Sequence, residues 1–273
     1  AGDYEIKISG NITDFAFNDT GDKDKILEVS NFGGLTLNSA AFLGSSNLDI
    51  TATKEPKLTS LIGCFSNCDS LVFNSSLDNW DISSLTSINK VFFSCELFNQ
   101  PLNNWDISNV IDISYFVASC TNFNQPLNNW DVSKVTNMFA SFRDSAFNQN
   151  INNWITSECL NMSQTFFLAS SFNQPLNNWD VSKVTNMFII FRESAFNQNI
   201  NNWDTSRVTN MSGCFQNNIS YNQPLNGWNY TKVTNISNIL GGKSTEYNAN
   251  YLSDLLIKLD QDLVFANMVN VNL

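Results

Sequence analysis

The chain has 273 residues, and its 14 Lys and Arg against 25 Asp and Glu give a net charge of −11. This acidity argues against a nucleic-acid binder, and the absence of histidine excludes His-based triads and His-ligated metal sites. Hydrophobic residues make up 42% of the chain, which is too rich for disorder, and no apolar run reaches the ~20 residues of a membrane span.

The first segment, residues 1–10, reads AGDYEIKISG, in which Tyr4, Ile6 and Ile8 alternate with other residues as in a β-strand. It resembles the last strand of a PKD-type immunoglobulin-like domain, which implies that a domain precedes it. We therefore expect residues 1–24 to be the end of that domain and a linker. Residues 25–72 are expected to form degenerate N-terminal coils of the repeat that follows.

Residues 73–241 contain seven repeats that place every tryptophan in register. The spacings between successive Trp residues are 25, 25, 24, 25, 24 and 25. An aromatic residue lies seven positions before each Trp, and Ile or Met lies eight positions after it. A period of 24–25 falls in the leucine-rich-repeat range of about 20–29 and below the ~40–45 of a propeller blade. The seven residues are Trp80, Trp105, Trp130, Trp154, Trp179, Trp203 and Trp228.

Each repeat is predicted to be one coil of a right-handed, leucine-rich-repeat-like solenoid. In the unit FNQPLNNWDVSKVTNM, from Phe123 to Met138, the apolar spacing predicts a short parallel strand near Leu127–Val132. One coil cannot bury its own apolar face, so stacked coils should bury columns of equivalent residues ~4.8 Å apart. The Asn that follows the aromatic residue of each repeat is expected to point inward and to bond main-chain groups and its counterpart in the next coil.

The sequence FNQPLNNWDVSKVTNMF resembles the bacterial surface protein 26-residue repeat family, also called DUF285, which is related to BspA-like leucine-rich repeats. The resemblance covers roughly residues 25–265. It implies surface-exposed or secreted proteins of bacteria, some protists, phages and large viruses. It also implies binding or adhesion, with no known catalysis.

Residues 242–273 are expected to cap the stack. Ser244-Thr245-Glu246 can begin a helix that runs to about Asp260. Its apolar face would cover the last coil, as the ends of repeat arrays require. That face comprises Ala249, Leu252, Leu255, Leu256 and Leu259.

Several residues are candidate sites of chemistry. Cys95 and Cys120 each lie fifteen residues after a Trp, so they stack either as a disulfide or as two small buried thiols. Asp144 and Glu193 share a column two coils apart, yet copying of a duplicated segment accounts for this pair, and no glycosidase is expected. The carboxylates at Asp19–Asp24 suggest a solvated hairpin more than a calcium site.

Two columns are the partner-binding candidates. The first is a basic stripe four positions after Trp, which either meets an anionic partner or is a solvated edge; it comprises Lys134, Lys183, Arg207 and Lys232. The second rests on the duplication, because residues 123–154 and 172–203 differ at only three positions, two of them Ala140/Ile189 and Ser141/Ile190. A fold that accepts Ala and Ser there should leave isoleucine exposed, so Phe167, Ile189 and Ile190 are predicted to form an apolar partner patch.

Together these features predict a non-enzymatic, extracellular or cell-surface repeat protein that binds protein or glycan, without cofactor, metal, nucleic acid or membrane insertion. The alternative is a virion structural or decoration protein that uses the same solenoid for contacts with identical or neighbouring subunits.

Overall fold

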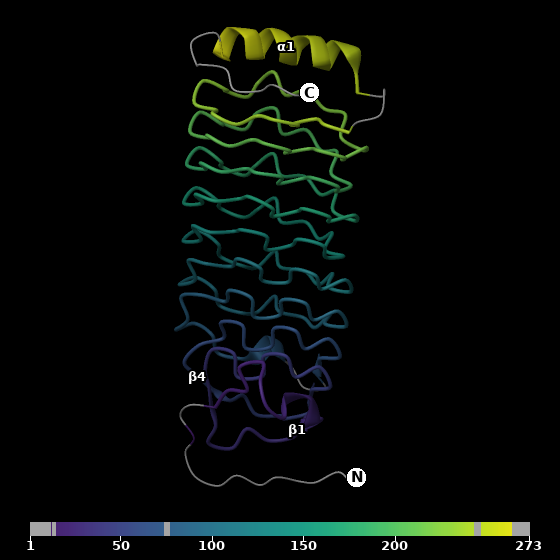
Figure 1. Cartoon of the computed structure of the whole chain (residues 1–273). Helices are drawn as coiled ribbons and strands as arrows, with labels where there is room; N and C mark the ends of the chain where they lie inside the picture. The colour runs from purple at the N-terminus through teal and green to yellow at the C-terminus, as the bar shows by residue number, and fades with distance from the viewer. Residues whose placement is uncertain (1–11, 13–14, 74–76, 243–246, 264–273) are drawn as a thin grey trace.

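The computed structural model describes residues 12, 15–73, 77–242 and 247–263. The chain runs through successive layers, each stacked on the one before it, from the N-terminal to the C-terminal end (Figure 1). Each layer corresponds to one sequence repeat, because hydrogen bonds join residues about one repeat apart, as from the Met138 N–H to the Asn161 carbonyl (2.9 Å). The expected repeat fold with short parallel strands is therefore present.

Regular elements are short and lie mostly in the first layers. Among the described residues, the 3₁₀ helices are η1 (Lys23–Lys25) and η2 (Leu77–Asn79), and the strands are β1 (Glu28–Val29), β2 (Thr36–Leu37), β3 (Asp49–Ile50), β4 (Lys57–Leu58) and β5 (Val72–Phe73). The parallel strands β1, β3 and β5 form one sheet in that order, and β2 pairs with β4 in another.

In the tryptophan repeats, the parallel pairing narrows to one residue per layer. With the Trp of each repeat counted as position 0, the bridged residues all lie at position 7: Ser87, Asp112, Asn137, Asn161, Asn186, Asn210 and Asn235. The prediction of a strand near Leu127–Val132 is wrong. That stretch turns at Asn128-Asn129, and side chains such as the Trp130 indole join it to the neighbouring layers.

Positions 8 to 14 of each repeat form a second connection between layers, here called the turn ribbon. Positions 10 and 14 have positive φ in all seven tryptophan repeats. In the first six of them, the backbone N–H groups of positions 8, 10, 12 and 14 donate to the next layer. In the Trp130 repeat, these donors are Met138, Ala140, Phe142 and Asp144, with bonds of 2.8–3.0 Å. The peptide unit that precedes each of these positions accepts from the layer before it and donates to the layer after it, whereas the units between them bond within their own layer, as from the Ser141 N–H to the Met138 carbonyl (3.2 Å). Alternate peptide units therefore link the layers in continuous amide columns.

The core contains the predicted aromatic columns together with columns of aliphatic residues and methionine. The Trp154 ring stacks nearly parallel between Trp130 and Trp179, with centroid distances of 6.2 and 6.1 Å. Buried indoles need a hydrogen-bond partner, and Trp154 donates its Nε1–H to the Leu127 carbonyl of the preceding layer (3.0 Å). The same bond recurs from Trp105 to Trp228, so this column is both apolar and fully hydrogen-bonded.

The asparagine that follows the aromatic residue lies at the surface in the six repeats where it is described, from Asn99 to Asn222, which corrects the expectation that it points inward. Its bonding to the next layer is as predicted. The Asn148 side-chain oxygen accepts the backbone N–H of Asn173 (3.0 Å) and the side-chain amide of Gln174 (3.2 Å). The column continues to Asn222, whose oxygen accepts the N–H of Asn248 at the start of the C-terminal helix.

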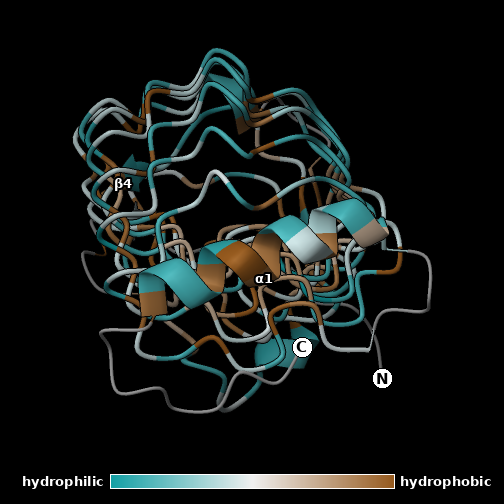
Figure 2. Cartoon of the chain, turned by 90° about the horizontal axis from the view of Figure 1, so that it is seen from above, coloured by the Kyte–Doolittle hydropathy of each residue, from teal (hydrophilic) through white to brown (hydrophobic). Residues whose placement is uncertain are grey.

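The C-terminal helix α1 (Ala249–Leu263) is present, with Leu255, Leu259 and Leu263 buried. Figure 2 shows it lying across the end of the stack. Its first turn is capped by the side chain of Asn248, which accepts the N–H of Asn250 (2.9 Å); the expected capping segment 244–246 lies outside the described residues. Leu256, expected on the covered face, is exposed. No helix within the described ranges is long and apolar enough to cross a membrane.

The stack begins before the predicted boundary at residue 25. Phe15 forms a parallel bridge with Leu37, and the N–H of Phe17 donates to the Ala41 carbonyl (3.0 Å) in the same pattern as the later layers. The part of segment 1–24 that is described from Phe15 onward thus packs on the repeats. The strand and PKD-type resemblance expected at residues 1–10 lie outside the described residues.

Candidate binding surfaces

The predicted basic stripe is one surface column at position 4. Lys134 donates its Nζ to the Asn109 side chain of the layer before it (2.8 Å), and Lys183 pairs with Glu158 (2.6 Å). Arg207 and Lys232 continue the column and are exposed, and no ion pair is recorded for either of them in the described part of the chain. The structure therefore brings the four predicted residues into line, interleaved with neutral and acidic side chains.

A column of carboxylates, which was not predicted from the sequence, runs beside this stripe. At position 1, Asp131 accepts the Ser133 backbone N–H (3.0 Å). The Ser133 hydroxyl, then its N–H, and also the Lys134 charge lower the pKa of the Asp131 carboxyl, while burial opposes the shift. The recurring Trp-Asp pair was the available signal. The stripe is thus half of a mixed-charge surface.

The predicted apolar patch is wrong in its central residues. Ile189 is 6% exposed and Ile190 is 0% exposed, so neither presents a surface to a partner. Ile189 fits because the next layer has Gly213 at the same position, and a Cβ on that glycine would lie 2.8 Å from the Ile189 Cγ2. At this position, the layer that follows the first copy has Gln164, whereas the layer that follows the second copy has Gly213. The glycine leaves the space that the Ile189 side chain fills.

Phe167, the third residue of that patch, is half-buried between two cations. The guanidinium carbons of Arg143 and Arg192 lie 5.2 and 5.5 Å from its ring centroid, from the layers before and after it. Arg192 also pairs with Glu193 (2.9 Å). Cation–π contacts of this kind stabilise the surface by about 0.5–1 kcal/mol each and leave no flat ring face open to a partner.

The carboxylates of Asp144 and Glu193 lie at position 14 of the turn ribbon, where both residues have positive φ. Asp144 accepts a long hydrogen bond from the Ser119 hydroxyl (3.4 Å), and Glu193 is held by Arg192. The described geometry therefore assigns them to inter-layer and surface contacts.

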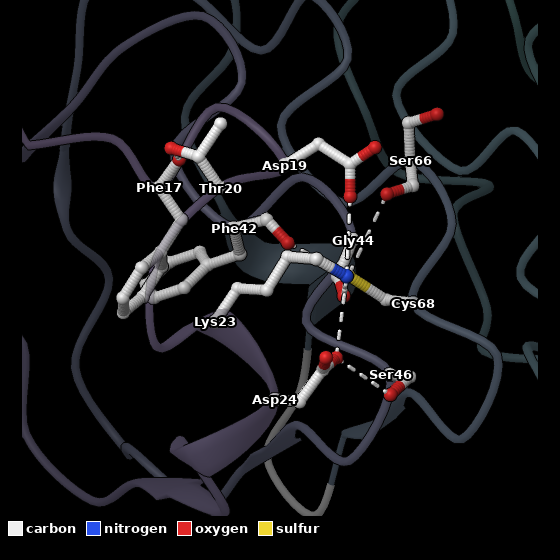
Figure 3. Close-up of polar contacts among 10 residues, drawn as sticks. All are labelled: Phe17, Asp19, Thr20, Lys23, Asp24, Phe42, Gly44, Ser46, Ser66 and Cys68. Atoms are coloured by element: carbon white, nitrogen blue, oxygen red, sulfur yellow. Dashed lines mark hydrogen bonds and ion pairs between the residues drawn. The ribbon is translucent and has the colours of Figure 1, made fainter.

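The aspartates near the N-terminus are bound to lysines. Lys23 lies 3.1 Å from Asp19 and 3.3 Å from Asp24, and it donates to the Gly44 carbonyl (2.8 Å), as Figure 3 shows. Ser46 donates to Asp24 from the next layer (3.0 Å). The Lys23 ammonium lies between the two carboxylates, where a bound metal ion would have to lie. Among the described residues, no group of three or more Cys, Asp or Glu could hold a metal ion.

Cys95 and Cys120 are free, buried thiols in the structure, so of the two alternatives it contains the thiol pair. Each Sγ–H donates to a carbonyl of the preceding layers, from Cys95 to Phe65 and from Cys120 to Phe92, both at 2.8 Å. Burial raises the pKa of Cys120 to about 12 and that of Cys95 well above its usual value. These thiols are therefore poor nucleophiles at neutral pH.

We expect the six thiols to make stability pH-dependent above neutrality. All six are buried, and burial raises the pKa of Cys159, for example, to about 12. A raised folded-state pKa contributes stability that is complete below the unfolded value of ~8.5 and is lost as the pH rises toward the folded value. The free energy of unfolding, measured with urea at pH 7.5 and 9.5, should fall by up to ~1.4 kcal/mol per pH unit and thiol.

The control variant is Cys159→Val, because position 5 is Val135 and Val184 in the adjacent repeats. It should show a smaller decrease between the two pH values. An unfolding free energy that is equal at both would contradict the burial of the thiols.

A shallow recess of about 400 Å³ lies on another side of the stack. Four of its five lining residues are Asn or Gln, from two consecutive layers; the residues are Pro175, Asn177, Gln198, Asn199 and Asn202. Amide groups donate and accept hydrogen bonds but do not transfer protons at neutral pH. The Gln198 Nε2 already donates to Asn173, and the Asn202 Nδ2 donates to the Asn177 carbonyl (2.8 Å), so a polar ligand would meet the remaining donor and acceptor sites of these amides.

The fold and these surfaces define a class: a protein of stacked repeats whose polar side chains form regular surface columns. A family model described as Mycoplasma protein of unknown function, DUF285, matches residues 59–176 and 136–255. These matches together span more than half of the chain, and the chain belongs to this family. No curated protein and no solved structure matches it.

Proposed function

We propose that this is a non-enzymatic, extracellular or surface-exposed repeat protein that binds protein or glycan partners in adhesion, without a cofactor. The observation that carries the proposal is the amide-lined recess at Pro175, Asn177 and Gln198. Asn and Gln match the hydroxyl groups of a glycan because each amide offers both donors and acceptors. The burial of the thiols and the pairing of Glu193 with Arg192 favour binding over catalysis.

In this proposal, the repeats are right-handed, leucine-rich-repeat-like solenoid coils related to the BspA-like proteins. The repeat length of 24–25 residues and the parallel pairing of each layer with the next support it. A virion structural or decoration protein is the alternative location for the same architecture, with neighbouring subunits as its partners.

The proposed function is tested by binding the purified chain to an array of immobilised glycans and extracellular proteins. We expect binding to hydroxyl-rich glycans. Asn177→Ala with Asn202→Ala should weaken it about tenfold or more, because each lost hydrogen bond contributes on the order of 1 kcal/mol. The control is Ile219→Ser, an exposed change outside the recess. Absence of binding by the unmodified chain, or equal binding by the double variant, would overturn the proposal.

A further inference from the structure

The recess lies in a part of the chain that the duplication copies without change. Its five lining residues all fall within the second copy, residues 172–203. The first copy, residues 123–154, has the same residue types at the five equivalent positions, because none of the three differences between the copies falls on them. The equivalents of Pro175, Asn177, Gln198, Asn199 and Asn202 are Pro126, Asn128, Gln149, Asn150 and Asn153.

The hydrogen bonds at these positions are also the same in both copies. Asn202 donates its Nδ2 to the Asn177 carbonyl (2.8 Å). In the first copy, Asn153 donates its Nδ2 to the Asn128 carbonyl (2.7 Å). Each glutamine donates its Nε2 to a backbone carbonyl of the preceding layer, at 3.1 Å in both copies. The asparagine after it accepts a backbone N–H with its side-chain oxygen, at 2.9 Å in both copies. The first copy therefore repeats the construction of the recess.

The same polar groups are left for a ligand in each copy. The Asn199 side-chain oxygen accepts the Asn201 N–H, and its Nδ2 has no hydrogen-bond partner in the described part of the chain. Within the same described ranges, the Gln198 Oε1 and the Asn202 Oδ1 accept no hydrogen bond. Donors and acceptors together match the hydroxyl groups of a sugar, which donate and accept. In the first copy, the corresponding groups belong to Asn150, Gln149 and Asn153.

The surface on which the two copies lie is uncharged. In the six repeats from Trp105 to Trp228, the six positions before Trp contain no charged residue, although the net charge of the chain is −11. Most of these positions are Asn, Gln or Pro, as in NQPLNN before Trp130 and NQNINN before Trp154. A strip without charges does not attract an ionic ligand, so the chemistry of this surface favours a neutral one.

We propose that the first copy forms a second binding position, and that the two positions together bind one neutral, linear polysaccharide that runs along the stack. This inference rests on the proposed function, because it specifies the class of glycan that the recess binds. The two positions are two layers apart, or ~10 Å at ~4.8 Å per layer, and a chain of identical sugar units presents the same hydroxyl groups at regular intervals. Binding at the second position is then intramolecular, which raises the overall affinity by about 10²–10⁴-fold.

The first test measures how the affinity depends on the length of the glycan. Isothermal titration calorimetry uses size-graded neutral oligosaccharides of dextran, β-1,4-glucan and mannan, from about two to about six sugar units. We expect two short oligosaccharides to bind per chain, and one long oligosaccharide to bind about 100-fold more tightly or better. Short oligosaccharides that bind without a gain for longer ones overturn this inference alone. A chain that binds none of these series also overturns it, and one that binds nothing on the array of glycans and proteins overturns the proposed function as well.

The second test removes the free amide donors of one copy at a time. Asn199→Asp keeps the oxygen that accepts the Asn201 N–H, and Asn150→Asp makes the same change in the first copy. Each variant should weaken the binding of long oligosaccharides about tenfold or more, and to a similar extent, because either change leaves a single binding position. An Asn150→Asp variant that binds like the unmodified chain, while Asn199→Asp is weakened, would show that the first copy holds no ligand.

The matched control for these variants is Asn31→Asp. Asn31 is exposed and lies outside both copies, and its side-chain oxygen accepts the N–H of Gly33, two residues further on (2.8 Å). The control therefore adds the same negative charge and keeps the same type of hydrogen bond. Because salt screens a distant charge, its affinity for the long oligosaccharides should stay within about twofold of that of the unmodified chain. A loss as large as that of Asn199→Asp would assign the effect to net charge and overturn the inference.

Discussion

Replacing Trp154 with alanine should lower the free energy of unfolding by about 3–5 kcal/mol. The ring is 2% exposed, and its removal leaves a cavity between Trp130 and Trp179 that the rigid layers cannot close. It also leaves the buried Leu127 carbonyl without its donor, an additional cost of about 1–3 kcal/mol. The measurement is urea denaturation followed by far-UV circular dichroism, which reports the loss of the stacked layers.

The control for this change is Ile155→Ala at the neighbouring position, where the side chain is 62% exposed. It should change stability by no more than about 0.5 kcal/mol, as surface substitutions usually do. A Trp154→Ala variant with the same midpoint as this control would mean that the tryptophan column is not part of the core.

Gly213→Ala should destabilise the protein by about 2–4 kcal/mol. Gly213 has φ of +62°, where any Cβ is strained, and the new Cβ would lie 2.8 Å from the Ile189 Cγ2. In the other copy of the duplicated unit, Ala140 takes the place of Ile189, and the next layer has Gln164 in the place of Gly213. A residue with a Cβ is therefore accommodated there. Restoring that combination with Ile189→Ala should remove the steric part of the cost.

The double-mutant cycle measures this coupling. We expect the cost of Gly213→Ala to be about 1–3 kcal/mol smaller when residue 189 is alanine, a range typical of residues in contact. Costs that add without coupling would show that Ile189 does not fill the space above Gly213.

The core was predictable from the sequence because each apolar position is repeated seven times. The aromatic residue seven positions before Trp stacks from layer to layer, as between Phe147 and Phe172 at 6.2 Å. The C-terminal helix was also predictable from its apolar spacing. The start of this helix was not predictable, because the residue that caps it, Asn248, also continues the asparagine column of the repeats.

The turn ribbon had no signature in the sequence. Left-handed backbone usually indicates Gly or Asn, but position 10 holds Lys90, Tyr115, Ala140, Gln164 and Ile189 among its seven residues. Hydrogen bonds to two neighbouring layers hold these residues in the conformation, so tertiary structure overrides local preference. The same cooperation between layers explains why Ile189 was wrongly predicted to be exposed: Gly213 of the following layer leaves the space that its side chain fills.

The one-way hydrogen bonding of the turn ribbon gives this part of the stack an electrical direction. Each peptide unit has a dipole of ~3.5 D, and in this ribbon the units of successive layers point the same way, with N–H groups toward the C-terminal end. The ribbon thus carries a macrodipole whose positive end is C-terminal, the reverse of an α-helix.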